Sequence, residues 1–292
     1  MRFKHAAFTM LELVFVIVIM GIIGKFGVEF LAQAYNSFIF SKINHELQSN
    51  SEAAVEFIAK RLEGRIKDSV IARTEINGTV VAVADATGDS FTVLEWIASD
   101  EDGFRGNSLP NWSGIIDLGS NTSNGNALYS PETNTSAENR LITVLSNNDS
   151  NINDGALYFI GSDSDIQSGY GWNGQITDQN RTMHPINNDA NISQFIPAAG
   201  TGNFHEVYEY YKLSWTANAI VLQNNNLYFY YNYQPWKGEI ATDGKRSLLM
   251  QNVSTFRFTA IGSIIKIQVC AKSTVLSQDG GDYSLCKEKT VF

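Results

Sequence analysis

The sequence predicts an α+β protein in which one long N-terminal helix packs on an antiparallel β-sheet head that carries a loop-rich β insertion. Two features of the chain predict this class. An apolar run near the N-terminus continues into a stretch with helical apolar periodicity. The rest of the 292 residues alternates aromatic and β-branched runs with clusters of Asn, Ser, Asp and Gly, which is typical of strands joined by turns.

The N-terminal helix is expected over residues 8–67 and has two parts. Residues 8–32 are mostly apolar and are long enough to cross about 30 Å of hydrocarbon. Residues 33–67 carry one apolar stripe, which consists of Ile43, Leu47, Ala54, Ile58, Leu62 and Ile66. At 1.5 Å per residue the whole helix would measure about 90 Å. We therefore expect its second half to reach the head and to pack against a β-sheet.

A short basic leader precedes the apolar run, and one carboxylate stands where the run begins. Arg2 and Lys4 lie in the leader, and Glu12 lies just before residues 13–23. A secretory signal peptide has small residues at a cleavage site after its apolar core, and the sequence after residue 23 offers no good site of that kind. A charge at the bilayer centre costs about 2.5–3.5 kcal/mol on insertion scales, which makes Glu12 a candidate functional residue.

The segment Phe8-Thr9-Met10-Leu11-Glu12 resembles the prepilin-type N-terminus of type IV pilins and type II secretion pseudopilins. The resemblance is specific over about residues 5–30. It implies cleavage between Ala7 and Phe8, methylation of the new amine of Phe8, and pairing of Glu12 with the N-terminal amine of a neighbouring subunit. The family usually has Gly where Ala7 stands. The alternative is an uncleaved membrane anchor in which Glu12 has no role in assembly.

The resemblance also implies partners and a location. Family members are cut by a prepilin peptidase, assembled at an inner-membrane platform, and packed with other pilin or pseudopilin subunits. Because Arg2 and Lys4 precede the span, the positive-inside rule keeps the leader, residues 1–7, in the cytoplasm. The β-rich head, residues 68–292, is then expected in the periplasm, with the chain held in the inner membrane by its N-terminal helix.

Three glycines lie in the apolar helix at intervals of three residues. Small residues at such spacing let helices approach closely in lipid, and the alternative is local weakening of the helix, since each Gly costs about 1 kcal/mol relative to Ala. These residues are Gly21, Gly24 and Gly27. Many family members carry a Pro a little further on, and its absence from residues 27–30 is more common among minor pseudopilins.

The head is expected to be built from short strands. Asn77-Gly78 within residues 69–84 predicts a hairpin, and residues 224–226, all Asn, predict a turn between two later strands. Other strands are expected over residues 91–97, 141–145, 156–160, 207–216, 219–223, 227–233, 247–250, 255–260 and 264–271. Residues 99–202 are rich in turn-forming residues and are expected to form the loop-rich insertion. The closing strands resemble those of the large J-type and W-type minor subunits of the family.

The two cysteines, Cys270 and Cys286, lie close together near the C-terminus. In an exported chain such a pair is expected to form a disulfide, which also resembles the pilin pattern. The closed loop would contribute about 3 kcal/mol in the chain-entropy model. Two free thiols remain the alternative.

No cofactor is expected, with calcium as the weak exception. Oxygen-bearing side chains cluster at Asp149, Asn151 and Asn153, and calcium takes six to eight oxygen ligands from such loops. Similar clusters occur at residues 100–102 and 163–165. The spacing at Asp149 departs from an EF-hand because Gly155 comes one position late and no Glu closes the loop. Turn formation by Asp and Asn is the favoured interpretation.

Composition and motifs argue against an enzyme and give no indication of nucleic-acid binding. The formal net charge is −9, and removal of a leader with Arg2 and Lys4 would make it −11. Nonspecific DNA binding needs phosphate neutralisation by Lys and Arg, although DNA or a secreted protein stays open as a partner. The four histidines are scattered, and no nucleophile elbow or zinc motif occurs.

Two functions remain. The first is a structural minor pilin or pseudopilin of a type IV pilus, a type II secretion system or a competence filament, assembled through its N-terminal helix. The second is a membrane-tethered periplasmic binding or adhesion domain, for a glycan or a surface, that never enters a filament. Dense aromatic residues between 208 and 236 would support glycan stacking, with sheet packing as the favoured alternative.

Overall fold

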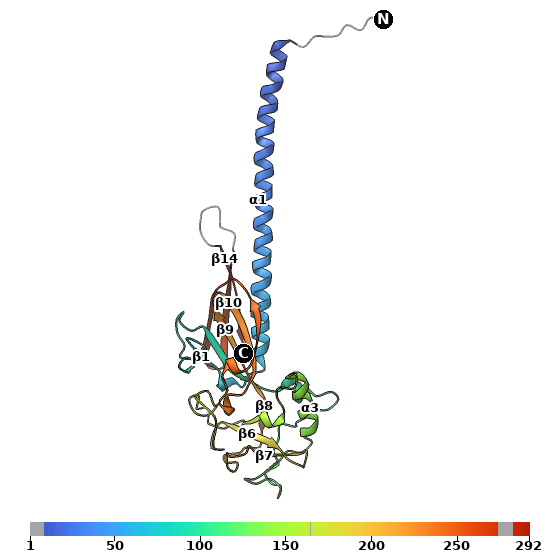
Figure 1. Ribbon diagram of the computed structural model, residues 1–292, viewed down its shortest axis with the longest axis vertical. Coiled ribbons are helices and arrows are strands. Elements are labelled where there is room, and N and C mark those ends of the chain that lie inside the picture. The colour runs from blue at the N-terminus through green and yellow to red at the C-terminus, as the bar shows by residue number, and fades with distance from the viewer. Residues whose placement is uncertain (1–8, 164, 274–282) are drawn as a thin grey trace.

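The computed structural model describes residues 9–163, 165–273 and 283–292, and shows one long helix rising from a head with two lobes (Figure 1). Helix α1 spans Met10–Glu63 and contains 54 residues, which corresponds to about 80 Å. Its C-terminal half lies on the lobe that we call the proximal lobe, and a distal lobe lies beyond the C-terminal end of α1. The fold is α+β, with the helix packed on antiparallel sheets as predicted.

Helix α1 ends at Glu63, four residues before the predicted end at Lys67. Gly64 is its C-cap. The backbone then turns toward strand β3, where the N–H of Ile66 donates to the carbonyl of Ile97 at 2.9 Å. The helix stops here because residues past the glycine pair with a strand that is distant in the sequence, which the apolar stripe alone does not reveal.

The proximal lobe contains two antiparallel sheets. The larger has six strands in the order β11-β10-β9-β3-β1-β2, and the smaller has the order β12-β13-β14. Their bounds are β1 Ile71–Arg73, β2 Val81–Ala82, β3 Val93–Ala98, β9 Thr216–Gln223, β10 Asn226–Tyr233, β11 Lys245–Met250, β12 Val253–Ile261, β13 Ile264–Lys272 and β14 Ser284–Val291. Helix α1 shares one apolar core with both sheets.

The distal lobe is inserted between β3 and β9 and has its own five-stranded sheet, in the order β4-β7-β6-β5-β8. Its elements are α2 Glu101–Arg105, β4 Leu128–Tyr129, α3 Thr135–Leu145, β5 Ala156–Phe159, β6 Met183–Asn188, β7 Gln194–Pro197 and β8 Tyr211–Ser214. The described residues also contain four 3-10 turns, η1 Lys67–Ser69, η2 Ile152–Asp154, η3 Pro235–Lys237 and η4 Ala241–Asp243. Strand β8 is followed at once by β9, so the insertion returns directly to the six-stranded sheet.

Three apolar clusters hold these parts together. The first lies between α1 and the two proximal sheets and contains Ile58 and Leu62, both fully buried. The second covers the opposite face of the six-stranded sheet, where Trp172 and Met183 from the insertion pack against it. The third fills the distal lobe. Ile66 belongs to the second cluster rather than to the helical stripe predicted for it, because the chain has already left the helix.

Most of the predicted strands are confirmed. The Asn224–Asn226 interruption is a hairpin turn in which Asn224 and Asn225 both have positive φ, and Gln223 pairs with Asn226. The hairpin at residues 69–84 is present as the pair β1 and β2, but its connection is longer than a two-residue turn and Gly78 lies inside that loop. Residues 207–216 contain β8 and the start of β9 rather than one strand.

The prediction of a strand over residues 141–145 is wrong, because these residues form the end of helix α3. The side chain of Asn134 caps this helix by accepting from the N–H of Ala137 at 3.0 Å. Thr135, Glu138 and Ile142 are buried at helical spacing, while Val144 is exposed. The upstream cap and this spacing outweigh the β-branched composition of the last turn.

The last strand, β14, was not among the sequence predictions, and it ties the C-terminus to α1. Its Lys287 and Lys289 form ion pairs with Glu52 and Glu56 of the helix. A disulfide joins Cys270 in β13 to Cys286 in β14, as expected, at positions that are directly paired across the two strands.

We predict that Ile58→Ala destabilises the proximal lobe by about 2–5 kcal/mol, because the deleted atoms leave a cavity between α1 and both sheets. Ile192→Ala, at a site that is 44% exposed, is the matched control and is expected to change stability by less than about 0.5 kcal/mol. Urea unfolding in detergent micelles, followed by circular dichroism, measures both variants. Equal losses would show that α1 does not carry the core.

Candidate functional site

The projecting segment of α1, residues 10–38, is exposed along its whole length. Figure 1 shows it extending away from both lobes. Its large exposed apolar side chains are Met10, Leu11, Leu13, Val14, Phe15, Val16, Ile17, Val18, Ile19, Met20, Ile22, Ile23, Phe26, Val28, Phe30, Leu31, Tyr35 and Phe38. Soluble proteins rarely expose so large a continuous apolar surface, so this segment needs a lipid or protein environment.

The segment is long and apolar enough to span a membrane, and α1 is the one such helix in the part of the chain that the structure describes. This fits a single-pass anchor. A span of about 20 residues covers about 30 Å of hydrocarbon. Counted from Met10, such a span ends near Glu29, and the exposed apolar residues Phe30, Leu31, Tyr35 and Phe38 lie beyond it.

Glu12 forms a reciprocal capping box with Thr9 at the start of α1. The Glu12 Oε2 atom accepts from the backbone N–H and from the hydroxyl of Thr9, both at 2.9 Å, and the N–H of Glu12 donates to Thr9 Oγ1 at 3.4 Å. The carboxylate also complements the positive end of the helix dipole. Ala7 and Phe8, the predicted processing residues, lie outside the described residues, and their role stays a prediction.

The three glycines of the projecting segment leave open space around the helix. A Cβ atom added at Gly21, Gly24 or Gly27 would meet no atom within 4 Å beyond the adjacent residues and the local helix backbone. A second helix therefore has room to approach the backbone on this side. One ion pair follows, in which Lys25 Nζ lies 3.9 Å from Glu29 Oε1 one turn later.

The calcium candidates Asp149, Asn151 and Asn153 lie in local turns, where other groups already contact their oxygens. Asn151 Oδ1 accepts from the N–H of Asn153 at 2.9 Å, and Asn153 Oδ1 accepts from the N–H of Asn188 at 2.9 Å. Asp149 forms an ion pair with Lys245. Within the described ranges, no three His, Cys, Asp or Glu side chains are grouped in a way that would hold a metal ion.

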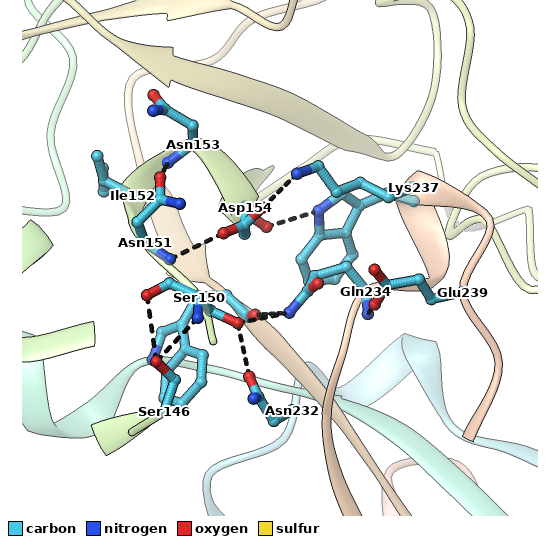
Figure 2. Close-up of polar contacts among 12 residues, drawn as sticks. Ser146, Ser150, Asn151, Ile152, Asn153, Asp154, Asn232, Gln234, Lys237 and Glu239 are labelled. Carbon is cyan, nitrogen blue, oxygen red and sulfur yellow. Dashed lines mark hydrogen bonds and ion pairs between the residues drawn. The ribbon is translucent and has the colours of Figure 1, made fainter. Parts of the chain in front are cut away.

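The loop that contains these residues instead connects the two lobes, as Figure 2 shows. Asp154 forms an ion pair with Lys237, and its Oδ2 accepts from the N–H of Asn151 at 2.8 Å. The backbone carbonyl of Asp154 accepts from Trp236 Nε1 at 3.0 Å. Sequence reasoning missed Lys237 because 83 residues separate it from Asp154.

Buried hydroxyl and amide groups continue this junction. Ser150 Oγ donates to Asn232 Oδ1 at 2.6 Å, and Gln234 Nε2 donates to the carbonyl of Trp215 at 2.9 Å (Figure 2). Ser150, Asn232 and Gln234 are all buried. Buried polar groups that are satisfied in this way hold a unique arrangement, so the junction fixes the distal lobe on the proximal one.

The aromatic residues between 208 and 236 differ in exposure, and Trp215, Tyr228 and Tyr231 are partly buried. Tyr211, Tyr230, Tyr233 and Trp236 are buried in the apolar clusters, whereas Tyr208 and Tyr210 are exposed. Most of this aromatic density therefore packs in the sheets and cores, and Tyr208 and Tyr210 have the most surface available to a ligand.

Tyr210 is the centre of an exposed apolar row on the distal lobe. It pairs with Ile115 on one side, and its carbonyl accepts from the N–H of Ile160 on the other side at 2.9 Å. Ile115, Tyr210 and Ile160 are 38%, 54% and 54% exposed, while their sequence neighbours Ile116, Tyr211 and Phe159 are buried. We call Ile115, Ile160, Tyr208 and Tyr210 the apolar row.

Comparisons with known proteins find no counterpart: no family model matches the chain, and neither the curated proteins nor the solved structures contain a match.

We predict that Asp154→Ala destabilises the junction by about 1–3 kcal/mol, because Lys237 and the N–H of Asn151 lose their acceptor. Asp178→Ala is the matched control, since Asp178 also pairs with a cation, Arg181, and accepts from a backbone N–H, but on the surface. Its expected effect is below about 1 kcal/mol. Thermal unfolding of both variants is the measurement, and equal shifts would mean that the junction contributes no more than a surface pair.

Proposed function

We propose that this chain is a minor subunit of a filament of the type IV pilin and pseudopilin class, serving a pilus, a type II secretion system or competence. One observation carries the proposal. A single helix begins with a capping box formed by Thr9 and Glu12 and exposes its entire apolar N-terminal half. It buries one face of its C-terminal half against antiparallel sheets. A helix of this kind joins a membrane or filament core to a folded head.

The apolar surface beyond the expected span supports packing with other helices. Phe30, Leu31, Tyr35 and Phe38 are between 64% and 70% exposed, and they lie between the end of a 30 Å span and the head. Leaving them in water would cost hydrophobic free energy of about 25 cal/mol per Å² of apolar surface. Helices of neighbouring subunits would cover this surface, and the glycine side of the segment leaves room for their approach.

The geometry of Glu12 supports a contact between subunits. Both donors of Thr9 bind Glu12 Oε2, and no hydrogen bond from the described residues reaches Oε1. In the proposed mechanism, cleavage between Ala7 and Phe8 creates an amine, and the amine of a neighbouring subunit pairs with this free oxygen. Pairing would offset the cost of burying the carboxylate in the filament core, whereas an unpaired charge there would be penalised.

The position of the distal lobe supports a place at the end of the filament. This lobe lies past the C-terminal end of α1, on the side away from the projecting segment (Figure 1). A subunit stacked ahead along the filament axis would need the same space. We therefore propose a tip position rather than a repeated position in the shaft.

The proposal places the chain in the bacterial inner membrane, with the head in the periplasm. Its partners would be prepilin peptidase, the inner-membrane assembly platform and other pilin or pseudopilin subunits. The chain itself would have a structural role, without catalysis. Mass spectrometry of the mature N-terminus, with and without prepilin peptidase, tests the proposal. N-methyl-Phe8 followed by Thr9 supports it, and an intact Met1 or a cut after the apolar segment contradicts it.

We predict that Glu12→Gln lowers incorporation into sheared filaments at least about tenfold, because breaking a buried ion pair costs several kcal/mol. Glu29→Gln is the matched control, as Glu29 is a carboxylate in the same segment whose partner, Lys25, belongs to the same chain. Immunoblots of the filament fraction and of the membrane fraction measure both variants. Unchanged incorporation of Glu12→Gln would contradict the role of this residue in assembly.

A second candidate function, adhesion by a tethered head, is favoured by the apolar row. Exposed apolar side chains gathered on one side of the distal lobe are an unusual solvent surface, and such patches mark binding sites. Two of the four residues of the row are tyrosines, which offer flat rings for stacking and a hydroxyl for hydrogen bonding. This function would not require entry into a filament.

We predict for this second function that Tyr210→Ser lowers binding to a glycan array or to the target surface at least about tenfold, which is the size of effect expected for a central aromatic anchor. Tyr283→Ser, at another exposed tyrosine, is the control. An adhesion head that works outside a filament keeps its binding in the Glu12→Gln variant. Full binding by Tyr210→Ser would remove the apolar row as the adhesive surface.

A further inference from the structure

Two carboxyl groups meet in the interior of the distal lobe, where α2 and α3 come together. Asp100 is the N-cap of α2, and Glu138 lies in the first turn of α3. They are 4% and 1% exposed, and both carboxyl groups lie beside Gly103. We call this pair the carboxyl corner. Two acidic groups that touch in the interior cannot both carry a charge without a large cost.

Burial raises the pKa of Asp100, and the hydrogen-bond donors around its carboxyl oppose that shift. Its Oδ2 accepts from Trp112 Nε1 at 2.8 Å, and its Oδ1 accepts from the N–H of Gly103 at 3.2 Å. A carboxylate that accepts several N–H groups is stabilised in its ionised state.

The surroundings of Glu138 favour its neutral form. Its Oε2 accepts from Asn111 Nδ2 at 3.1 Å, but its buried Oε1 has no hydrogen-bond partner. Burying an oxygen that has no hydrogen-bond partner costs much less free energy on a neutral carboxylic acid than on a charged carboxylate. A protonated Glu138 can donate to Asp100, whereas a charged Glu138 would repel it.

Gly103 is what lets the two groups touch. A Cβ atom at this position would lie 1.9 Å from Asp100 Oδ2 and 2.2 Å from Glu138 Oε2. Any side chain at residue 103 would therefore push the two carboxyls apart. The contact between α2 and α3 at this point is built around the pair.

No cation balances the corner. Among the described residues, neither Asp100 nor Glu138 forms an ion pair with Lys, Arg or His, and the nearby charged group that acts on Glu138 besides Asp100 is Asp102, which is also negative. Arg105, on the same short helix, lies 3.9 Å from Asp102 rather than at the pair. A proton is therefore the one positive charge available to hold the two carboxyls together.

We propose that Asp100 and Glu138 share a single proton, that this proton fastens α2 to α3, and that its loss at alkaline pH releases this corner of the distal lobe. The device goes beyond assembly into a filament and does not depend on it. It would make the lobe that faces away from the membrane sensitive to the pH of its surroundings, while the proximal lobe keeps its own core.

The direction of the pH dependence follows from the pKa of Glu138. Burial, and then the charge of Asp100, raise this pKa from 4.5 to about 9. In the unfolded chain Glu138 loses its proton near pH 4.5, whereas in the folded protein it keeps the proton up to about pH 9. The shared proton therefore stabilises the folded state fully below about pH 4.5. Above that pH, the folding equilibrium constant falls by up to tenfold for each pH unit. The stabilisation is lost as the pH rises through about 9.

Glu138→Gln tests the proposal, because the amide keeps the size of the side chain and offers an N–H to Asp100 but does not titrate. Thermal unfolding of the full chain in detergent micelles is measured from pH 5 to pH 9.5. Relative to this variant, the folding constant of the wild type is expected to fall by up to tenfold per pH unit. Glu101→Gln, next to the corner and exposed, is the control and should follow the wild type. Parallel curves for wild type and Glu138→Gln would overturn the proposal.

Infrared spectroscopy of the wild type provides a second test that needs no variant to fold. A protonated buried carboxyl has a C=O stretch that is separate from the carboxylate bands. We expect this band at neutral pH, with loss at a midpoint near pH 9. Absence of the band at neutral pH, or its loss near pH 4.5, would show that the carboxyls do not share a proton and would overturn the proposal.

Discussion

Burial of one face of α1 between two antiparallel sheets is the interaction on which the rest of the molecule depends. Residues such as Val55, Ile58 and Leu62 fill a core that neither the six-stranded nor the three-stranded sheet closes by itself. Because the same helix continues far beyond the head, this core also anchors the projecting segment. A force applied to the exposed apolar half of α1 is thereby transmitted to both sheets.

The two lobes differ in the group that lies beside a buried carboxyl. In the proximal lobe, Glu95 is buried against Arg73 at 3.0 Å and accepts from the hydroxyl of Tyr233 at 3.3 Å. Burial raises the pKa of Glu95, and the Arg73 guanidinium opposes that shift. In the distal lobe, Asp100 has another acid beside it instead of a cation. A cation on a long side chain keeps its charge over the whole physiological range, whereas a proton leaves when the pH rises.

The distal lobe is a fixed part of the head rather than a loosely attached module. Trp172 packs on the outer face of the six-stranded sheet, and its Nε1 donates to the carbonyl of Ser69 at 3.0 Å. Together with the junction around Ser150 and Asp154, this contact fixes the lobe beyond the end of α1. The position of the distal lobe relative to α1 is therefore set by buried contacts and not only by the chain connection.

The sequence by itself determined the local features of this protein, which are the long helix, the apolar character of its first half, the Asn turn at residues 224–226 and most strands. These follow from periodicity and turn chemistry within short windows. It also identified Glu12, Cys270 and Cys286 as the residues to examine. Only the tertiary structure decided the end of α1 at Glu63, the helix at residues 135–145 and the pairing of Asp100 with Glu138. Each of these depends on contacts between residues that are distant in the sequence, or on a cap that outweighs composition, and no periodicity encodes which distant groups will meet.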